Sequence, residues 1–324
     1  MKYWLAIIHE PRPAPGTDRM PPSPAADGSA GAGPAPLRFA RLLRLHHWLK
    51  NLLLGVPYLT AQAWTQPGAL SRLALGFAAF SLLASATYVL NDLSDRVADR
   101  AHAEKRHRPL AAGTVGVGAA LALALVTGLG GLALGYRVGL EFLSTLLVYA
   151  ALTTLYTRRL KRAALLDVLA LAGLWTLRLV AGAAAIGVVL SAWLLSFGAF
   201  LFLSLSLVKR CAELDAASLE QLPGRGYRRA DRPTLQAFGV ATGVVSVLVL
   251  ALFVDSTPAE QHYPHHARLW LLCPVVWFWL GRLWLMTGRG EMHHDPIVFS
   301  LRDPPSWVAL AALAAVWVAA LVPA

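Results

Sequence analysis

Nine long apolar stretches constrain the fold of this chain more than any other feature. We assign them to residues 47–64, 71–90, 115–135, 139–157, 165–188, 190–208, 234–254, 268–287 and 306–322. A transmembrane helix needs about 20 mostly apolar residues, which is close to the length of each stretch. A soluble domain carries about 25% charged residues, whereas this chain carries only 15%. The pattern predicts an all-α integral membrane protein with nine transmembrane helices.

The first 36 residues have a different composition, rich in Pro, Gly, Ala and Ser. Such a segment buries too little apolar surface to offset the conformational entropy that it would lose on ordering. We predict a disordered cytoplasmic tail at residues 1–36 and one polytopic transmembrane domain at residues 37–324.

Basic residues indicate how the chain crosses the membrane, because cytoplasmic loops carry an excess of Lys and Arg. With a cytoplasmic N-terminus, the basic flanks and the large polar loops 91–114, 209–233 and 288–305 fall on the cytoplasmic side, and the C-terminus lies outside. The opposite side then has only Arg72, Arg137 and Arg268. This bias also explains the net charge of +11 without a nucleic-acid partner. The composition points to a bacterial inner membrane.

The most polar loop follows the second apolar stretch and reads NDLSDRVADRAHAEKRHRPLAAG, from residue 91 to residue 113. On a helix, Asp92, Asp95 and Asp99 would share one face, about one turn apart. Clustered carboxylates repel one another, and oxygen ligands together with substrate phosphates suit Mg²⁺. The basic residues Lys105, Arg106 and Arg108 follow and would hold further phosphate charge. The loop predicts a Mg²⁺–diphosphate site, with a solvated loop of mixed charge as the alternative.

A second polar group spans residues 156–178 and enters the fifth apolar stretch. Asp167 and Arg178 are eleven residues apart and would share a helical face. An arginine inside the membrane costs at least about 2.5 kcal/mol on insertion scales, so it should face a cavity or a partner. The alternative is that Arg178 pairs with a carboxylate to join two helices. Lys161 either reaches lipid phosphate or binds a substrate phosphate.

Two further groups lie at the ends of apolar stretches. Arg44, Trp48 and Asn51 would share a helical face, with Lys50 beside it, and a buried amide such as that of Asn51 needs partners. The alternative is ordinary anchoring of the helix at the membrane interface. Lys209 and Arg210 lead into a basic, glycine-containing turn, which is either a mobile lid over an anionic substrate or a plain connector.

The spacing Asn91-Asp92-x-x-Asp95-x-x-x-Asp99 resembles in full the NDxxDxxxD motif of the UbiA superfamily of intramembrane prenyltransferases. The resemblance continues through KRHRPLAAG to Tyr156, Lys161 and Asp167, and covers about residues 38–322. It implies nine transmembrane helices around a central cavity, with a cytoplasmic cap over Mg²⁺-bound phosphates. By this resemblance Asp92, Asp95 and Asp99 would bind Mg²⁺ and Asn91 would position the motif.

A second acidic motif, DxxxD, is usual in the aromatic prenyltransferases of this superfamily, but here Asp167 has no second carboxylate four residues away. The single carboxylate, together with the segments RLHHWLKN, YTRRLKRAALLD and LRLVAGA, makes the sequence more similar to the decaprenyl-phosphate phosphoribosyltransferase branch. Members of that branch transfer 5-phosphoribose from phosphoribosyl diphosphate to a polyprenyl phosphate. The expected catalytic residues are Asp92, Asp95, Asp99 and Asp167. The expected substrate-binding residues are Lys50, Asn51, Asn91, Lys105, Arg106, Arg108, Tyr156, Lys161, Arg178, Lys209 and Arg210.

Two alternative functions remain at this point. An aromatic prenyltransferase would move a polyprenyl group from its diphosphate to an acceptor such as 4-hydroxybenzoate, but it should need fewer basic residues. A cation-coupled transporter would use the acidic motif to bind its ion, but such sites tend to lie near the membrane midplane. The number of basic residues favours phosphoribosyl transfer.

Overall fold

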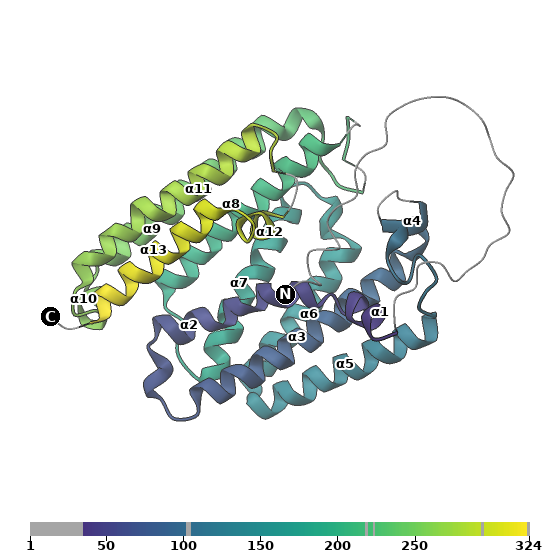
Figure 1. Ribbon diagram of the computed structural model, residues 1–324, viewed down its shortest axis with the longest axis horizontal. Helices are drawn as coiled ribbons and strands as arrows, with labels where there is room; N and C mark the ends of the chain where they lie inside the picture. The colour runs from purple at the N-terminus through teal and green to yellow at the C-terminus, as the bar shows by residue number, and fades with distance from the viewer. Residues whose placement is uncertain (1–34, 102–104, 218–219, 223, 293–294, 323–324) are drawn as a thin grey trace, which may run out of the picture.

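The structure is a computed structural model that describes residues 35–101, 105–217, 220–222, 224–292 and 295–322 (Figure 1). The predicted tail at residues 1–36 lies almost entirely outside these ranges and stays a prediction. The short helices, with η for a 3₁₀-helix, are α1 (Ala35–Leu42), η1 (Leu45–Leu54), α2 (Gly55–Thr60), η2 (Ala63–Thr65), α4 (Arg96–Ala101), η3 (Lys105–His107), η4 (Leu160–Arg162), η5 (Arg229–Asp231), α10 (Thr257–His262), η6 (His266–Leu271) and α12 (Pro296–Ser300).

Eight helices of the described chain are long and apolar enough to cross a membrane. They contain α3 (Ala69–Ser94), α5 (Val117–Val138), α6 (Leu140–Arg158), α7 (Leu166–Ile186), α8 (Ala192–Ala216), α9 (Arg232–Val254), α11 (Leu272–Gly288) and α13 (Pro304–Leu321). Two of the eight begin earlier than these bounds, because η5 leads directly into α9 and η6 leads directly into α11. They coincide with the second to ninth predicted stretches, which confirms the all-α membrane architecture. α8 continues well past the predicted end at residue 208, because the buried Arg210 has charged partners within the fold.

The first predicted stretch, residues 47–64, differs from the others because it is not one long α-helix. It consists of η1, α2 and η2 in succession. Pro57 lies within α2 and lacks a backbone amide hydrogen, which weakens a continuous α-helix at this point. A 3₁₀-helix rises about 2.0 Å per residue against about 1.5 Å in an α-helix, so η1 crosses the same distance with fewer residues.

Helix α7 connects the two halves of the molecule. It contacts η1, α2, α3 and α6 of the N-terminal half, and α8 of the C-terminal half. In Figure 1, α3 and α5 run side by side on one side of α7, and α9, α11 and α13 gather on the other. One buried core joins the halves, with Phe80 of α3, Leu179 of α7 and Leu283 of α11 among its members.

A close contact between α7 and η1 fixes the position of the N-terminal segment. A Cβ atom added at Gly182 would overlap the backbone of Leu54, at the end of η1. Only glycine leaves room for this approach. The contact brings the polar side chains of η1 against both α3 and α7, where the predicted site residues lie.

Candidate active site

The acidic motif lies where α3 ends and α4 begins. Asp92 is in the last turn of α3, Asp95 follows that helix with φ −90° and ψ 0°, and Asp99 lies in α4. Backbone hydrogen bonds from Asp95 N to Asn91 O (2.9 Å) and from Asp99 N to Asp95 O (2.8 Å) keep the turns close to helical. Asp92 and Asp99 are buried, whereas one third of the Asp95 side chain is exposed.

Each carboxylate of this motif has a basic partner. Arg108 Nη1 donates to both Asp92 Oδ1 (3.2 Å) and Asp99 Oδ2 (2.7 Å). Arg44 Nη2 donates to Asp92 Oδ1 at 2.6 Å. The Lys161 ammonium lies 3.6 Å from Asp95 Oδ2. The expected single face is therefore divided, because Asp92 and Asp99 share one guanidinium while Asp95 faces a different cation.

The donor chemistry of this motif fits a hard metal ion. Carboxylate oxygens are the ligands that Mg²⁺ prefers, and Asp92 and Asp99 already contact one common nitrogen of Arg108. Within the described ranges, no three Asp, Glu, His or Cys side chains lie close enough together to hold a metal ion. Basic side chains therefore neutralise the acidic motif in this geometry.

A row of hydrogen bonds joins the N-terminal segment to α3. Arg44 reaches Asp92, Trp48 Nε1 donates to Ser85 Oγ (3.0 Å), and Asn51 Nδ2 donates to Ser81 Oγ (2.9 Å). The three side chains that were expected on one face do point in a common direction, toward one side of α3. They thus hold the N-terminal segment in register with the helix that carries the acidic motif.

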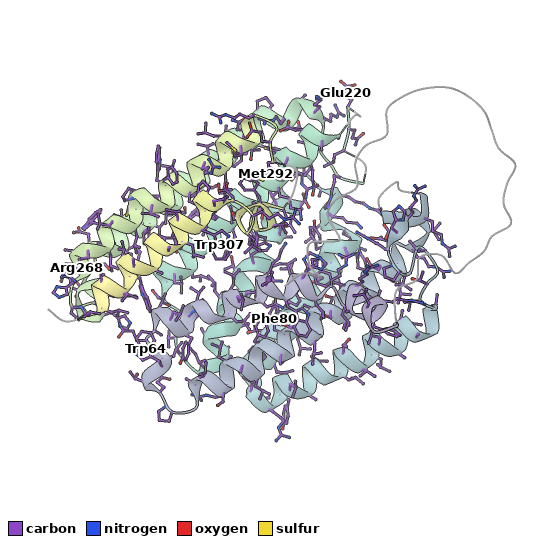
Figure 2. The ribbon with its side chains drawn as sticks, viewed as in Figure 1. Trp64, Phe80, Glu220, Arg268, Met292 and Trp307 are labelled. Atoms are coloured by element: carbon purple, nitrogen blue, oxygen red, sulfur yellow. The ribbon has the colours of Figure 1, made fainter. Side chains whose placement is uncertain are left out.

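Arg178 lies deep in α7 and is buried. Its Nε donates to Asn51 Oδ1 (3.0 Å) and its Nη1 to the Leu174 carbonyl (2.5 Å). Its guanidinium lies over the rings of Phe80 and Tyr149, at 5.2 and 5.3 Å from their centroids, and Phe80 is labelled in Figure 2. Among the described contacts Arg178 has no carboxylate partner, so its alternative role as half of an interhelical ion pair finds no support.

Asp167, in the first turn of α7, is the centre of a second polar cluster. Its Oδ1 accepts hydrogen bonds from Tyr156 Oη (3.0 Å) and Arg225 Nη1 (3.0 Å), and its Oδ2 lies 2.7 Å from Arg210 Nη2. Arg210 also pairs with Glu213. Both Asp167 and Arg210 have fully buried side chains. This cluster joins α6, α7 and α8 to the loop that carries Arg225.

Tyr227 supports the same cluster from that loop. Its hydroxyl accepts a hydrogen bond from the Leu165 amide (2.9 Å), and its ring lies under the Arg210 guanidinium at 5.5 Å. Burial raises the pKa of the Tyr227 hydroxyl to about 12, so the group stays protonated near neutral pH. Leu165 itself has φ 65° and ψ −43°, a backbone conformation that a leucine seldom adopts, and this hydrogen bond helps to hold it.

A third group connects the N-terminal segment to the last polar loop. Lys50 Nζ and Lys209 Nζ lie 2.7 and 3.4 Å from the same oxygen, Oδ2, of Asp295. Asp295 also accepts a hydrogen bond from the Ile297 amide (3.2 Å) as the N-cap of α12. Burial alone would raise the pKa of the Asp295 carboxyl, but Lys209 and Lys50 outweigh it and lower the pKa to about 2.

The other predicted residues contribute less to these clusters. Asn91 is half-buried at the end of α3. Arg106 is exposed and contacts the neighbouring His107 at 3.4 Å. The side chain of Lys105 lies outside the part of the chain that the structure describes.

Sequence reasoning missed several members of the clusters. Glu213 and Arg225 belong to the Asp167 cluster, and Asp295 holds the two lysines. An Asp directly before a proline that begins a helix signals an N-cap, but it does not reveal a partner 245 residues away at Lys50. Arg44 precedes η1, where its contact to Asp92 depends on the left-handed backbone at φ 52°.

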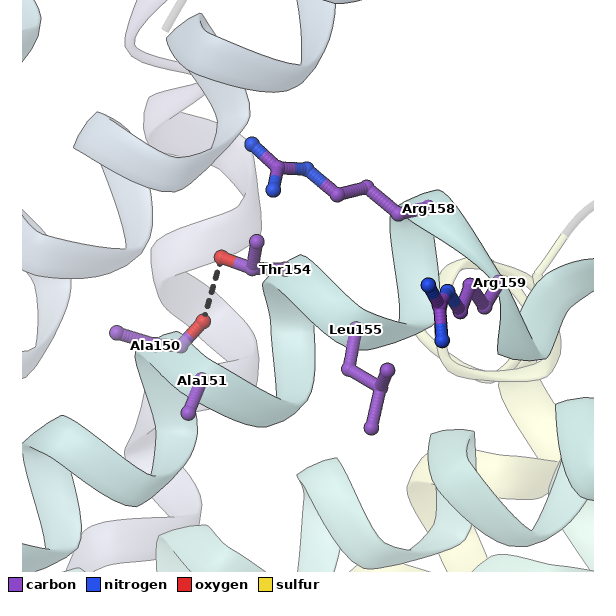
Figure 3. A pocket seen from close by; sticks show the side chains of 6 residues that line it. All are labelled: Ala150, Ala151, Thr154, Leu155, Arg158 and Arg159. Atoms are coloured by element: carbon purple, nitrogen blue, oxygen red, sulfur yellow. Dashed lines mark hydrogen bonds between the residues drawn. The ribbon is translucent and has the colours of Figure 1, made fainter.

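A separate hollow of about 520 Å³ lies on the outer face of α6 (Figure 3). It is lined by Ala150, Ala151, Thr154, Leu155, Arg158 and Arg159. None of these residues belongs to the three polar clusters, so this hollow is distinct from the candidate active site.

Comparison with known proteins identifies the class. The sequence matches the UbiA prenyltransferase family over residues 53–322, which include the whole NDxxDxxxD motif. The chain belongs to the UbiA prenyltransferase family and is an integral membrane transferase.

Three relatives illustrate where the chain lies within that family. Protein y4nM of Sinorhizobium fredii is 40% identical over 283 residues, which cover 86% of this chain but 55% of y4nM. Nodulation protein NoeC of Azorhizobium caulinodans is 34% identical over 288 residues, covering 86% of this chain and 91% of NoeC. Decaprenyl-phosphate phosphoribosyltransferase of Mycobacterium tuberculosis is 34% identical over 181 residues, covering 55% of this chain and 60% of that enzyme.

Solved structures support the fold. The UbiA homolog from Archaeoglobus fulgidus bound to GPP and Mg²⁺ has a TM-score of 0.65 and 19% identity, covering 86% of this chain and 99% of that chain. A structure of digeranylgeranylglyceryl phosphate synthase has a TM-score of 0.64 and 13% identity, covering 88% of this chain and 98% of that chain.

Proposed function

We propose that this protein transfers 5-phosphoribose from phosphoribosyl diphosphate to a polyprenyl phosphate in a Mg²⁺-dependent reaction. The observation that carries the proposal is the number of basic side chains at one end of the helices. They are Arg44, Lys50, Arg108, Lys161, Lys209, Arg210 and Arg225, and each contacts a carboxylate of one of the three clusters. Both substrates are phosphorylated, so this reaction needs more cationic groups than transfer to a neutral aromatic ring.

In this reaction the bond between ribose C1 and the diphosphate oxygen breaks, and the diphosphate leaves with the electron pair. An oxygen of the lipid phosphate forms the new bond to C1. That oxygen is already anionic, so the step needs no strong general base. The products are polyprenyl-phosphoryl-5-phosphoribose and diphosphate.

Asp92 and Asp99, which meet at one nitrogen of Arg108, would hold Mg²⁺, and Asp95 would join them on leaving Lys161. The ion would supply Lewis-acid stabilisation of the leaving diphosphate. Arg108 now pairs with Asp92 and Asp99 and would bind the diphosphate oxygens instead. Lys161, beside Asp95, would bind the same group from α6. Asp167 would hold Arg210, Arg225 and Tyr156 in position around the donor.

Arg178 and Asn51 would hold η1 against α7 below the reacting groups. The apolar core beneath them, including Phe80 and Tyr149, excludes water. Water exclusion matters because water would compete with the lipid phosphate for the developing cation at C1.

We also propose that the N-terminus and all three clusters lie in the cytoplasm of a bacterium, with the C-terminus outside its inner membrane. The distribution of Lys and Arg supports this orientation. The orientation can be tested with a reporter that is active only outside the inner membrane, fused after residue 322 in one variant and after residue 216 in another. We expect reporter activity only in the fusion after residue 322, and the reverse pattern would contradict the orientation.

The decisive experiment uses purified protein in nanodiscs with Mg²⁺. One reaction contains polyprenyl phosphate and labelled phosphoribosyl diphosphate, and a parallel reaction contains polyprenyl diphosphate and labelled 4-hydroxybenzoate. We expect labelled lipid in the first reaction. This product should disappear in Asp95→Asn and when Mg²⁺ is chelated, and it should remain in Asp303→Asn. Product in the second reaction alone would replace the proposal with aromatic prenyl transfer.

A further inference from the structure

The group around Asp295 contains more positive than negative charge. Lys50 of η1 and Lys209 of α8 share this one carboxylate. Two cations are therefore grouped with a single anion among the described contacts.

The other two clusters are balanced. In the acidic motif, three carboxylates meet three basic side chains: Asp92, Asp95 and Asp99 with Arg44, Arg108 and Lys161. In the Asp167 cluster, two carboxylates meet two arginines: Asp167 and Glu213 with Arg210 and Arg225. Uncompensated charge is costly where water is scarce. The excess positive charge at Asp295 therefore favours an additional anionic ligand there.

The geometry at Asp295 indicates the kind of anion. Both ammonium groups converge on the single oxygen Oδ2, from elements that are far apart in the sequence. A phosphate oxygen at that position would meet the same two donors. The side chains of Lys50 and Lys209 are 12% and 33% exposed, so a ligand can reach them.

The surroundings of Lys50 favour a lipid over a free phosphate. Its ammonium lies 5.2 Å from the centroid of the Trp175 ring, and Trp175 packs against Phe202 at 5.5 Å. Both rings are largely buried, with 9% of Trp175 exposed, so the apolar wall that they form lies directly beside the phosphate position. Such a wall suits the first units of an isoprenoid chain, whereas inorganic phosphate would gain nothing from it.

We propose that Lys50 and Lys209 form the subsite for the phosphate of the lipid acceptor, and that the Asp295 carboxylate occupies this position until the lipid phosphate displaces it. This inference rests on the proposed function, because it names the site of that reaction's acceptor. It separates the two substrates: the donor diphosphate lies at the acidic motif and the lipid phosphate lies at the two lysines.

Calorimetric titration of farnesyl phosphate into the full-length protein in nanodiscs, without donor or Mg²⁺, tests the subsite. Lys50→Gln and Lys209→Gln should each weaken binding about tenfold, the loss of one charge-assisted hydrogen bond. Asp295→Asn should tighten binding about threefold to tenfold, because the amide competes less well for the lysines. Lys50→Arg should restore most of the lost affinity.

Asp303→Asn is the matched control. Asp303 is also a helix N-cap paired with one basic side chain, Arg282, at 2.7 Å, but neither residue contacts the lysines. This variant should bind farnesyl phosphate like the wild type. Thermal unfolding of every variant identifies any that has lost its fold.

Unchanged binding in Lys50→Gln and Lys209→Gln, or weaker binding in a well-folded Asp295→Asn, would overturn the subsite. A different outcome would be that both lysine variants bind phosphoribosyl diphosphate about tenfold more weakly, and farnesyl phosphate as well as the wild type does. In that case the lysines bind the donor, and their assignment to the lipid acceptor is wrong. Inorganic phosphate should bind at least tenfold more weakly than farnesyl phosphate; equal binding would exclude a lipid site. If farnesyl phosphate depends on the lysines but no phosphoribosyl lipid ever forms, the subsite stands and the proposed function fails.

Discussion

The Asp167 cluster and the acidic motif contain the same chemical groups, carboxylates paired with basic side chains, but one ion pair of each differs in burial: Asp167 with Arg210, and Asp95 with Lys161. Asp167 and Arg210 are fully buried, and Asp167 Oδ1 accepts two hydrogen bonds while its Oδ2 forms the ion pair with Arg210. Asp95 and Lys161 are 33% and 22% exposed and lie 3.6 Å apart. A buried ion pair exchanges its partners only at a high cost, whereas an exposed pair exchanges them readily. The comparison separates groups that position the site from groups that receive a ligand.

The largest expected effect concerns the buried cluster. Asp167→Asn leaves Arg210 without its buried counter-charge, and breaking such a pair costs about 3–5 kcal/mol. We expect a marked loss in the free energy of unfolding, measured by denaturation in detergent. The matched Asp95→Asn variant should unfold like the wild type. Equal stability of the two variants would remove the distinction between the clusters.

A smaller effect is expected at Asn51, which links the N-terminal segment to Arg178. Asn51→Ala removes the acceptor for Arg178 Nε and the donor to Ser81. An unsatisfied buried polar group costs about 1–3 kcal/mol. The unfolding midpoint should fall, whereas Thr242→Ala should leave it unchanged, because Thr242 is only half-buried in α9 and its hydroxyl donates to carbonyls of the same helix. A neutral Asn51→Ala would mean that Arg178 is held by its two aromatic rings alone.

Acid should weaken the contact at Asp295, whose exposed fraction of 13% lies between those of Asp167 (0%) and Asp95 (33%). Its pKa in the folded protein, about 2, is below the ordinary value of 3.8. The unfolded chain therefore binds the proton first, so the stabilisation is complete above about pH 4 and is lost as pH falls toward 2. The loss should be about 2 kcal/mol. Unfolding midpoints measured between pH 5 and pH 2 should fall less in Asp295→Asn than in the wild type, and parallel curves would contradict this assignment.

The smallest effect on stability is expected at the exposed pair. Lys161→Gln should change the free energy of unfolding by less than about 1 kcal/mol, because exposed pairs contribute little. Binding of phosphoribosyl diphosphate with Mg²⁺ should nevertheless weaken about tenfold, measured by calorimetry, since one phosphate contact is lost. A stability loss as large as that of Asp167→Asn would show that Lys161 has a structural role.

Much of the candidate site was predictable because local spacing determines it. The four polar residues of the acidic motif follow one another at fixed intervals, and their place at the end of α3 follows from the preceding apolar stretch. The common direction of Arg44, Trp48 and Asn51 was also predictable from helical spacing. The division of the motif between Arg108 and Lys161 was not, because the helix is interrupted at Asp95 and the partners come from other elements.

The sequence by itself determined the all-helical membrane architecture, since the length of an apolar stretch is a local property that the bilayer selects directly. It also determined the family, through a motif whose spacing lies within nine residues. Only the tertiary structure decided which charges meet. Arg225 reaches Asp167 across 58 residues of sequence. Asp295 reaches Lys50 across 245 residues and Lys209 across 86 residues. Such pairs form because helix packing brings distant helix ends together, and because an unpaired charge is costly where water is scarce. Neither condition can be read from a single segment of the sequence.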